Sequence, residues 1–105
     1  MKGFQLTFFT QQDRRHLGKQ MGHWLIELAQ TMGIRGATMF AAAEGFGHHR
    51  RFHSAHFVDL ADQPLEVVMA VSEEECQRLF DRLRAEGIKI FYVKSPVEFG
   101  VTGET

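Results

Sequence analysis

The side chains best able to do chemistry lie in one segment, residues 44–56, which reads EGFGHHRRFHSAH. Its glycines and basic residues are Gly45, Gly47, His48, Arg50 and Arg51. Two glycines around Phe46 allow a tight backbone turn whose N–H groups can face an anion. The basic side chains that come after this turn are suited to binding a phosphate group. The chain lacks the Gly-Lys-Ser/Thr signature of a Walker loop. The segment therefore predicts a local anion-binding loop, with an ordinary solvated loop as the alternative.

The histidines of this segment also have spacings found in metal sites. His49 and His53 are four residues apart, and His53 and His56 are three apart. Such residues share a face if the segment is helical. No cysteine accompanies them, because the chain's one cysteine, Cys76, lies in an apolar stripe. A divalent-metal site is thus an alternative to histidines that only titrate near neutral pH.

Titratable residues elsewhere form no recognisable catalytic arrangement. The sequence has no HExxH motif, no nucleophile elbow and no GxGxxG after a strand. Cys76 stands beside three glutamates, and we expect a buried structural thiol. His16 and His23 lie beside or on the first helix, where we expect solvent exposure. These observations indicate a protein that is not an enzyme.

The composition is that of a soluble globular protein. The chain has 105 residues, of which 44% are hydrophobic and 24% charged, and this length fits one domain over residues 1–105. The formal net charge of −1 gives no basic field that would attract nucleic acid. One cysteine, no secretory signal and no apolar stretch long enough to span a membrane favour a cytoplasmic location.

Apolar periodicity predicts the elements that position the basic segment. Alternation with period two, or short apolar runs, predicts strands over Phe4–Thr10, Gly36–Ala43, Leu65–Val71 and Ile88–Val93, with a further short strand at Val97–Val101. Between the second and third of these strands the segment 44–63 predicts a long loop, with a short strand at 56–60.

Two helices complete the pattern. Apolar residues at steps of three and four predict the first helix from about Lys19, with Leu17 on its stripe and Gly33 as its end. Ser72 and the glutamates that follow form a capping box for a second helix, which ends at Gly87.

The resulting order, β-α-β-loop-β-α-β, predicts an α+β fold of the ferredoxin-like type, an antiparallel sheet with two helices on one face. The third strand nevertheless carries apolar residues on both faces, with Val67 and Met69 on one side and Val68 and Ala70 on the other. An apolar sheet face without helices must be buried by some other surface, and self-association of the chain is the simplest way to bury it.

Several motifs together carry a family resemblance. They are Asp13-Arg14, Gly36-Ala37-Thr38, Gly45-Phe46-Gly47, Phe52-His53-Ser54-Ala55 and Gly87-Ile88-Lys89-Ile90-Phe91. In this combination the chain resembles the PII-like signalling proteins and, among them, the family called domain of unknown function 190. The resemblance implies a non-catalytic regulator with a ferredoxin-like subunit that assembles as a homotrimer.

The resemblance also implies a ligand and a site. PII proteins bind adenine nucleotides in clefts between subunits, so AMP, ADP or a cyclic nucleotide is expected as an effector, with no required cofactor. Together with the basic loop, the implied contacts are Ala37, Thr38, Gly45, Phe46, Gly47, His48, Arg50, Arg51, Gly87 and Lys89. The flexible loop at 44–63 is expected to dock on a partner such as a membrane channel or transporter.

The chain departs from the PII pattern at several positions. Its loop has no tyrosine to be modified, since the one tyrosine is Tyr92. The Thr102-Gly103-Glu104 run is not preceded by the two arginines that meet phosphates, which favours a monophosphate or diphosphate over a triphosphate. Ala41-Ala42 stands where many family members have Arg-Gly. The metal alternative has its own precedent in related copper-tolerance proteins that share this subunit fold.

Overall fold

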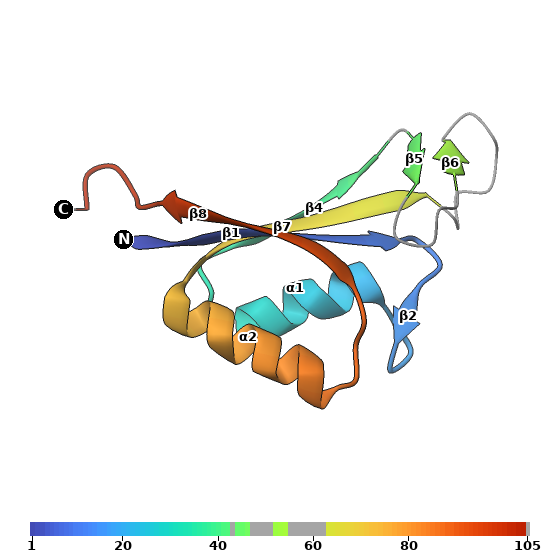
Figure 1. The fold of residues 1–105 in the computed structure, drawn as a ribbon, viewed down its shortest axis with the longest axis horizontal. Helices are drawn as coiled ribbons and strands as arrows, with labels where there is room; N and C mark the ends of the chain where they lie inside the picture. The colour runs from blue at the N-terminus through green and yellow to red at the C-terminus, as the bar shows by residue number, and fades with distance from the viewer. Residues whose placement is uncertain (43, 47–51, 55–62, 105) are drawn as a thin grey trace.

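The computed structural model of the chain describes residues 1–42, 44–46, 52–54 and 63–104. The elements in chain order are β1 (Lys2–Gln11), β2 (Arg15–His16), β3 (Lys19–Gln20), α1 (Met21–Thr31), β4 (Ala37–Ala41), β5 (Glu44–Phe46), β6 (Phe52–Ser54), β7 (Pro64–Ser72), α2 (Glu73–Ala85) and β8 (Phe91–Glu98). The main sheet is antiparallel with the strand order β4-β7-β1-β8. Both helices cover one of its faces (Figure 1). The ferredoxin-like prediction is confirmed.

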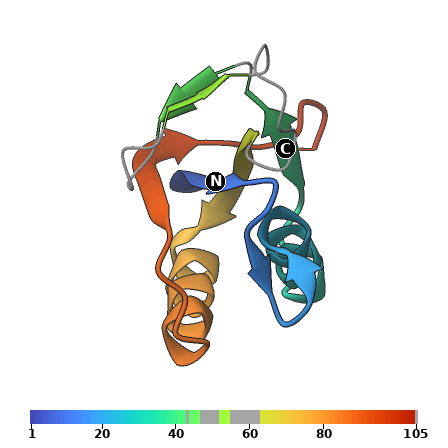
Figure 2. The same ribbon diagram turned by 90° about the vertical axis from the view of Figure 1, so that its right-hand side faces the viewer.

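The strands of the main sheet are amphipathic, because successive side chains point to opposite faces. In β7 every second residue from Leu65 to Val71 is buried, and the residues between them are half-buried. The helix-facing row pairs Phe8 of β1 with Val67. Figure 2 shows the two helices lying side by side beneath the sheet. The other face of the sheet, which we call the helix-free face, carries Val68 and Ala70, as the sequence predicts.

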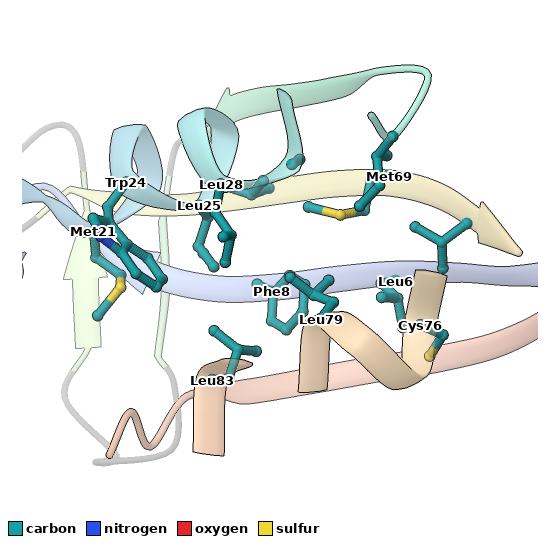
Figure 3. Packing of buried hydrophobic residues seen from close by; sticks show 14 residues of the cluster. Leu6, Phe8, Met21, Trp24, Leu25, Leu28, Met69, Cys76, Leu79 and Leu83 are labelled. Atoms are coloured by element: carbon teal, nitrogen blue, oxygen red, sulfur yellow. The ribbon is translucent and has the colours of Figure 1, made fainter. Parts of the chain in front are cut away.

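The core lies between this sheet and the two helices. Trp24, Leu25 and Leu28 of α1 meet the buried side chains of β1 and β7, and Leu79 and Leu83 of α2 close the other side (Figure 3). The remaining buried members are Leu6, Phe8, Met21, Ala29, Ile34, Leu65, Val67, Met69, Val71 and Cys76. The prediction of a buried Cys76 is confirmed.

Both helix ends have the local chemistry that their sequences predict. The Ser72 hydroxyl accepts from the Glu75 N–H at 3.1 Å, and the Glu75 carboxylate accepts from the Ser72 N–H at 2.8 Å. Gly87, with a φ of 68°, follows α2, and Ile88 N–H donates to Leu83 O at 3.0 Å. Gly33 ends α1 in the same Schellman geometry. In the described part of the chain, no helix is long and apolar enough to cross a membrane.

The start of α1 differs from the prediction. The helix begins at Met21, and the residues before it form a small β2–β3 hairpin. Leu17 is at the hairpin tip with a φ of 51°, and 75% of its surface is exposed, so the prediction that it belongs to the helical stripe was wrong. Gly18 follows with a φ of 80°. Two successive residues at positive φ are what a type I′ hairpin turn requires.

Two further boundaries differ from the predictions. The last strand begins at Phe91, so residues 88–90 are a connection, and Val97 belongs to the same strand as Phe91. The separate short strand at 97–101 was therefore wrong. Within the predicted loop 44–63, β5 and β6 form a two-stranded antiparallel ribbon. The strand predicted at 56–60 lies outside the described residues.

Candidate functional site

The register of the main sheet brings the base of the basic segment and the α2–β8 connection to the same end of the molecule. Phe40 of β4 pairs with Glu66, Glu66 with Phe9, and Phe9 with Phe91, so these residues form one row across the sheet. The chain passes beyond this row into β5 on one side, and β8 begins at it on the other. Figure 1 shows both features at the end of the sheet where α1 begins.

On the β4 side, four of the predicted nucleotide contacts lie in described strands. Ala37 packs against the core, whereas Thr38 is on the helix-free face and pairs with Val68. Gly45 and Phe46 belong to the β5–β6 ribbon, where Phe46 pairs with Phe52. The ribbon contacts β7, and Figure 2 shows it on the helix-free side of the sheet, lying across toward the β8 side.

Other residues singled out in the basic segment are outside the described part of the chain. They are Gly47, His48, His49, Arg50, Arg51 and His56. His53 is described as the backbone partner of Gly45. Among the described residues, no cluster of three or more His, Cys, Asp or Glu could hold a metal ion.

On the β8 side, the connection from Glu86 to Ile90 carries the other predicted contacts. Gly87 has a positive φ at the end of α2, and this backbone conformation explains why the position is a glycine. Lys89 is exposed. Ile88 and Ile90 flank Lys89 and pack against the core, and these contacts fix the position of the Lys89 backbone.

The two groups of contacts do not meet within one chain. Strands β4 and β8 are the two edges of the main sheet, with β7 and β1 between them. Neighbouring strands lie about 4.8 Å apart, so the edges are about 14 Å apart. A site between two copies of the chain, with the β8 edge of one beside the β4 edge of the next, would bring Lys89 and Thr38 together.

Two residues that were not among the predicted contacts, Arg14 and His16, hold the α2–β8 connection. The Arg14 guanidinium donates through Nη2 to the carbonyl oxygen of Lys89. His16 Nε2 is 2.9 Å from Glu86 Oε1, and the imidazole packs edge-on against Trp24 with ring centroids 4.6 Å apart. The expectation that His16 is exposed was wrong, whereas His23 is exposed as predicted.

The electrostatics of this end follow from these contacts. The hydrogen bond from His16 and then that from Arg82 hold the pKa of the Glu86 carboxyl below its ordinary value. Partial burial lowers the pKa of Arg14, which still leaves an arginine charged. Cys76 lies elsewhere, under α2, and burial raises the pKa of its thiol. A raised pKa disfavours the reactive thiolate, in agreement with a structural role.

A surface hollow of about 430 Å³ runs along α2, beside strands β1 and β8. Lys94 covers one side of it, with Nζ 4.1 Å from the centroid of the Phe4 ring. Its lining residues are Phe4, Glu73, Cys76, Gln77, Phe80, Arg84, Tyr92 and Lys94. None of the predicted nucleotide contacts is among them.

The helix-free face remains exposed on the single chain. Phe40 is 53% exposed, Phe91 49% and Val93 45%. Phe91 packs beside Phe9 with ring centroids 5.4 Å apart, so aromatic surface is continuous from β8 to β1. This is the apolar face that the sequence predicts would require a cover.

The fold is that of solved PII-like proteins. CPII from Thiomonas intermedia K12, described as a nitrogen regulatory PII-like protein, superposes with a TM-score of 0.69 over 96% of this chain and 91% of its own, at 16% identity. That CPII structure contains ADP, AMP and bicarbonate. A PII-like protein from Thermus thermophilus gives 0.63 over 91% and 87% of the chains, at 22% identity. The fold class is therefore PII-like.

The family is defined by sequence as well. Residues 3–98 match the DUF190 family model, described as "Uncharacterized ACR", and the chain belongs to this family. The UPF0166 protein of Aquifex aeolicus (strain VF5) is 28% identical over 82 residues, covering 77% of this chain and 78% of that relative. The resemblance stated from the motifs is confirmed.

Proposed function

We propose that this protein is a PII-like regulator that binds an adenine nucleotide, most readily AMP, ADP or a cyclic nucleotide, in clefts between the subunits of a homotrimer. The protein acts by binding rather than by catalysis and works in the cytoplasm. The observation that carries the proposal is that β8, which follows Lys89, and β4, which carries Thr38, are the two opposite edges of the main sheet.

This placement supports a site shared between chains. A cleft that brings the β8 edge of one copy to the β4 edge of the next would set the Lys89 ammonium opposite Thr38 and the β5–β6 ribbon. The exposed Lys89 ammonium suits a phosphate. The glycine-containing ribbon base would approach the ligand with its backbone. The solved CPII of similar fold contains ADP and AMP.

The helix-free face supports the assembly. Its exposed phenylalanines and valine are the apolar surface that a second and third copy would cover. The cover also explains why β7 and β8 carry apolar residues on both faces, as buried sheets do.

We further propose how the signal leaves the trimer. Ligand at the cleft would bias the conformation of the segment 44–63, and the favoured conformation would select a partner protein. A membrane channel or transporter is the partner class that the family resemblance implies.

The test is binding of nucleotide to the assembled protein. AMP, ADP and cyclic AMP are titrated calorimetrically and in thermal unfolding. Ligand at about 100 times its dissociation constant should stabilise the protein by about 2.7 kcal/mol. Zinc and copper salts, titrated in parallel, separate nucleotide binding from the metal alternative. The absence of heat and of thermal stabilisation with every nucleotide would overturn the proposal.

A further inference from the structure

The β2–β3 hairpin and the residues just before it contact the connection that carries Lys89. The hairpin is the short segment between β1 and α1, and its two strands pair Arg15 with Gln20. The hairpin contacts the 86–90 connection through side chains, at positions 70 and 75 residues away in the sequence. These contacts join the hairpin to the 86–90 connection, two segments that are not paired in the main sheet.

Arg14 makes the first contact and is fixed at both of its ends. Its backbone carbonyl accepts from the Met21 N–H at 2.8 Å, and its own N–H donates to Gln11 O at 3.2 Å. Its guanidinium donates to the Lys89 carbonyl. The hydrogen bond therefore joins the Lys89 backbone to the start of α1 through a half-buried, charged donor, and charge-assisted hydrogen bonds are the stronger kind.

His16 makes the second contact, one residue before the hairpin turn. Trp24, which is buried, fixes the plane of the imidazole from one side, and the Glu86 carboxylate binds Nε2. Arg82 also bonds the same carboxylate, at 3.2 Å. Glu86 is the residue directly before Gly87, so the contact fixes the backbone where the connection begins.

From these contacts we propose that the hairpin is a positioning element for the nucleotide cleft. Arg14 and His16, which we call the hairpin clamp, hold the 86–90 connection so that the Lys89 ammonium faces the ligand's phosphate from a fixed backbone. The inference rests on the proposed function for its ligand. Neither Arg14 nor His16 touches the nucleotide, and both act through the connection.

The experiment compares Arg14→Gln with the matched control Arg15→Gln. The Arg15 guanidinium bonds Gly18 O at 3.2 Å, within the hairpin, and does not contact the connection. Amide hydrogen exchange is followed at Gly87 and Ile88, and ADP affinity is measured by calorimetry on the same samples. We expect Arg14→Gln to speed exchange at both amides about tenfold and to weaken ADP binding by a similar factor. The control should change neither.

A second pair of variants covers the case in which Arg14→Gln does not fold. His16→Phe keeps the aromatic contact with Trp24 and loses the bond to Glu86, and Glu86→Gln removes the carboxylate from the other side. Both should speed exchange at Gly87 with little effect on the β1–β7 amides. Exchange that is unchanged in all these variants would overturn the inference.

The two readouts also separate this inference from the proposed function. Weaker ADP binding without faster exchange would mean that Arg14 contacts the ligand itself, and faster exchange with unchanged affinity would mean that the clamp is only structural. Either result overturns the positioning role. Faster exchange in a protein whose wild type binds no nucleotide would support the clamp and overturn the proposed function.

Discussion

The substitution Phe91→Glu tests whether the helix-free face is the surface through which copies of the chain assemble. Phe91 lies on that face at the start of β8, beside the connection that carries Lys89. It is 49% exposed on the single chain and packs against Phe9 of the same chain. The substitution therefore places a charge in the proposed interface and leaves the helix-facing core untouched.

The expected effect follows from the exposed area. A phenylalanine side chain has roughly 200 Å² to bury, so about half of it, roughly 100 Å², is left for a neighbour to cover. At about 25 cal/mol per Å² this burial contributes about 2.5 kcal/mol per subunit, or about 7.5 kcal/mol for three. Losing it weakens trimer association about 10⁵-fold, and burying a carboxylate adds to the loss.

The assay is light scattering coupled to size exclusion at micromolar protein. Wild type should elute with the mass of three chains, and Phe91→Glu with the mass of one. Leu17→Glu is the matched control, because Leu17 is 75% exposed at the β2–β3 hairpin tip, on the helix side of the sheet (Figure 1). Circular dichroism checks that each variant folds. A folded Phe91→Glu with the same mass as wild type would refute the reasoning.

Three further predictions concern single side chains. Ser72→Ala should lower the free energy of unfolding by about 1 kcal/mol in urea denaturation, since it removes the hydroxyl that caps α2; an unchanged midpoint would contradict the cap. The pKa of the Glu86 carboxyl is depressed in the folded protein. The ionised carboxylate should therefore stabilise the protein at pH values above its ordinary pKa of about 4.5, and this contribution should be lost as the pH falls through the lower pKa of the folded state. The stability advantage of wild type over Glu86→Gln should therefore shrink as the pH falls through about 4.5 and below, and an advantage that is constant with pH would contradict this. Lys89→Gln should weaken ADP binding at least tenfold in calorimetry, while Lys94→Gln, over the Phe4 ring, should not; equal effects would argue against a phosphate at Lys89.

Much of the fold could be predicted because its signals are local. The period-two burial of β7 and the Ser72 capping box are readable from a few neighbouring residues, and the structure has both. Gly33 and Gly87 end the helices because the Schellman geometry needs a positive φ that glycine adopts freely. The exposed apolar face could be predicted in the same way, since β7 carries apolar residues on both of its sides.

The features that sequence missed depend on backbone choices or distant contacts. Leu17 fits the spacing of the first helix, yet it occupies a hairpin turn, and Gly18 after it was the one signal of that turn. His16 is polar and stands beside a helix, so nothing local indicated its contact with Glu86. The contact from Arg14 to Lys89 spans 75 residues and exists only once α1 and α2 pack side by side.

The most direct test of the account is a crystal structure of the assembled protein grown with saturating ADP. The account predicts ADP between two chains, with a phosphate oxygen within hydrogen-bond distance of Lys89 Nζ from one chain and the adenosine beside Thr38 and the β5–β6 ribbon of the next. ADP bound wholly within one chain, for example in the hollow beside Lys94, or an assembled protein without ADP, would contradict it.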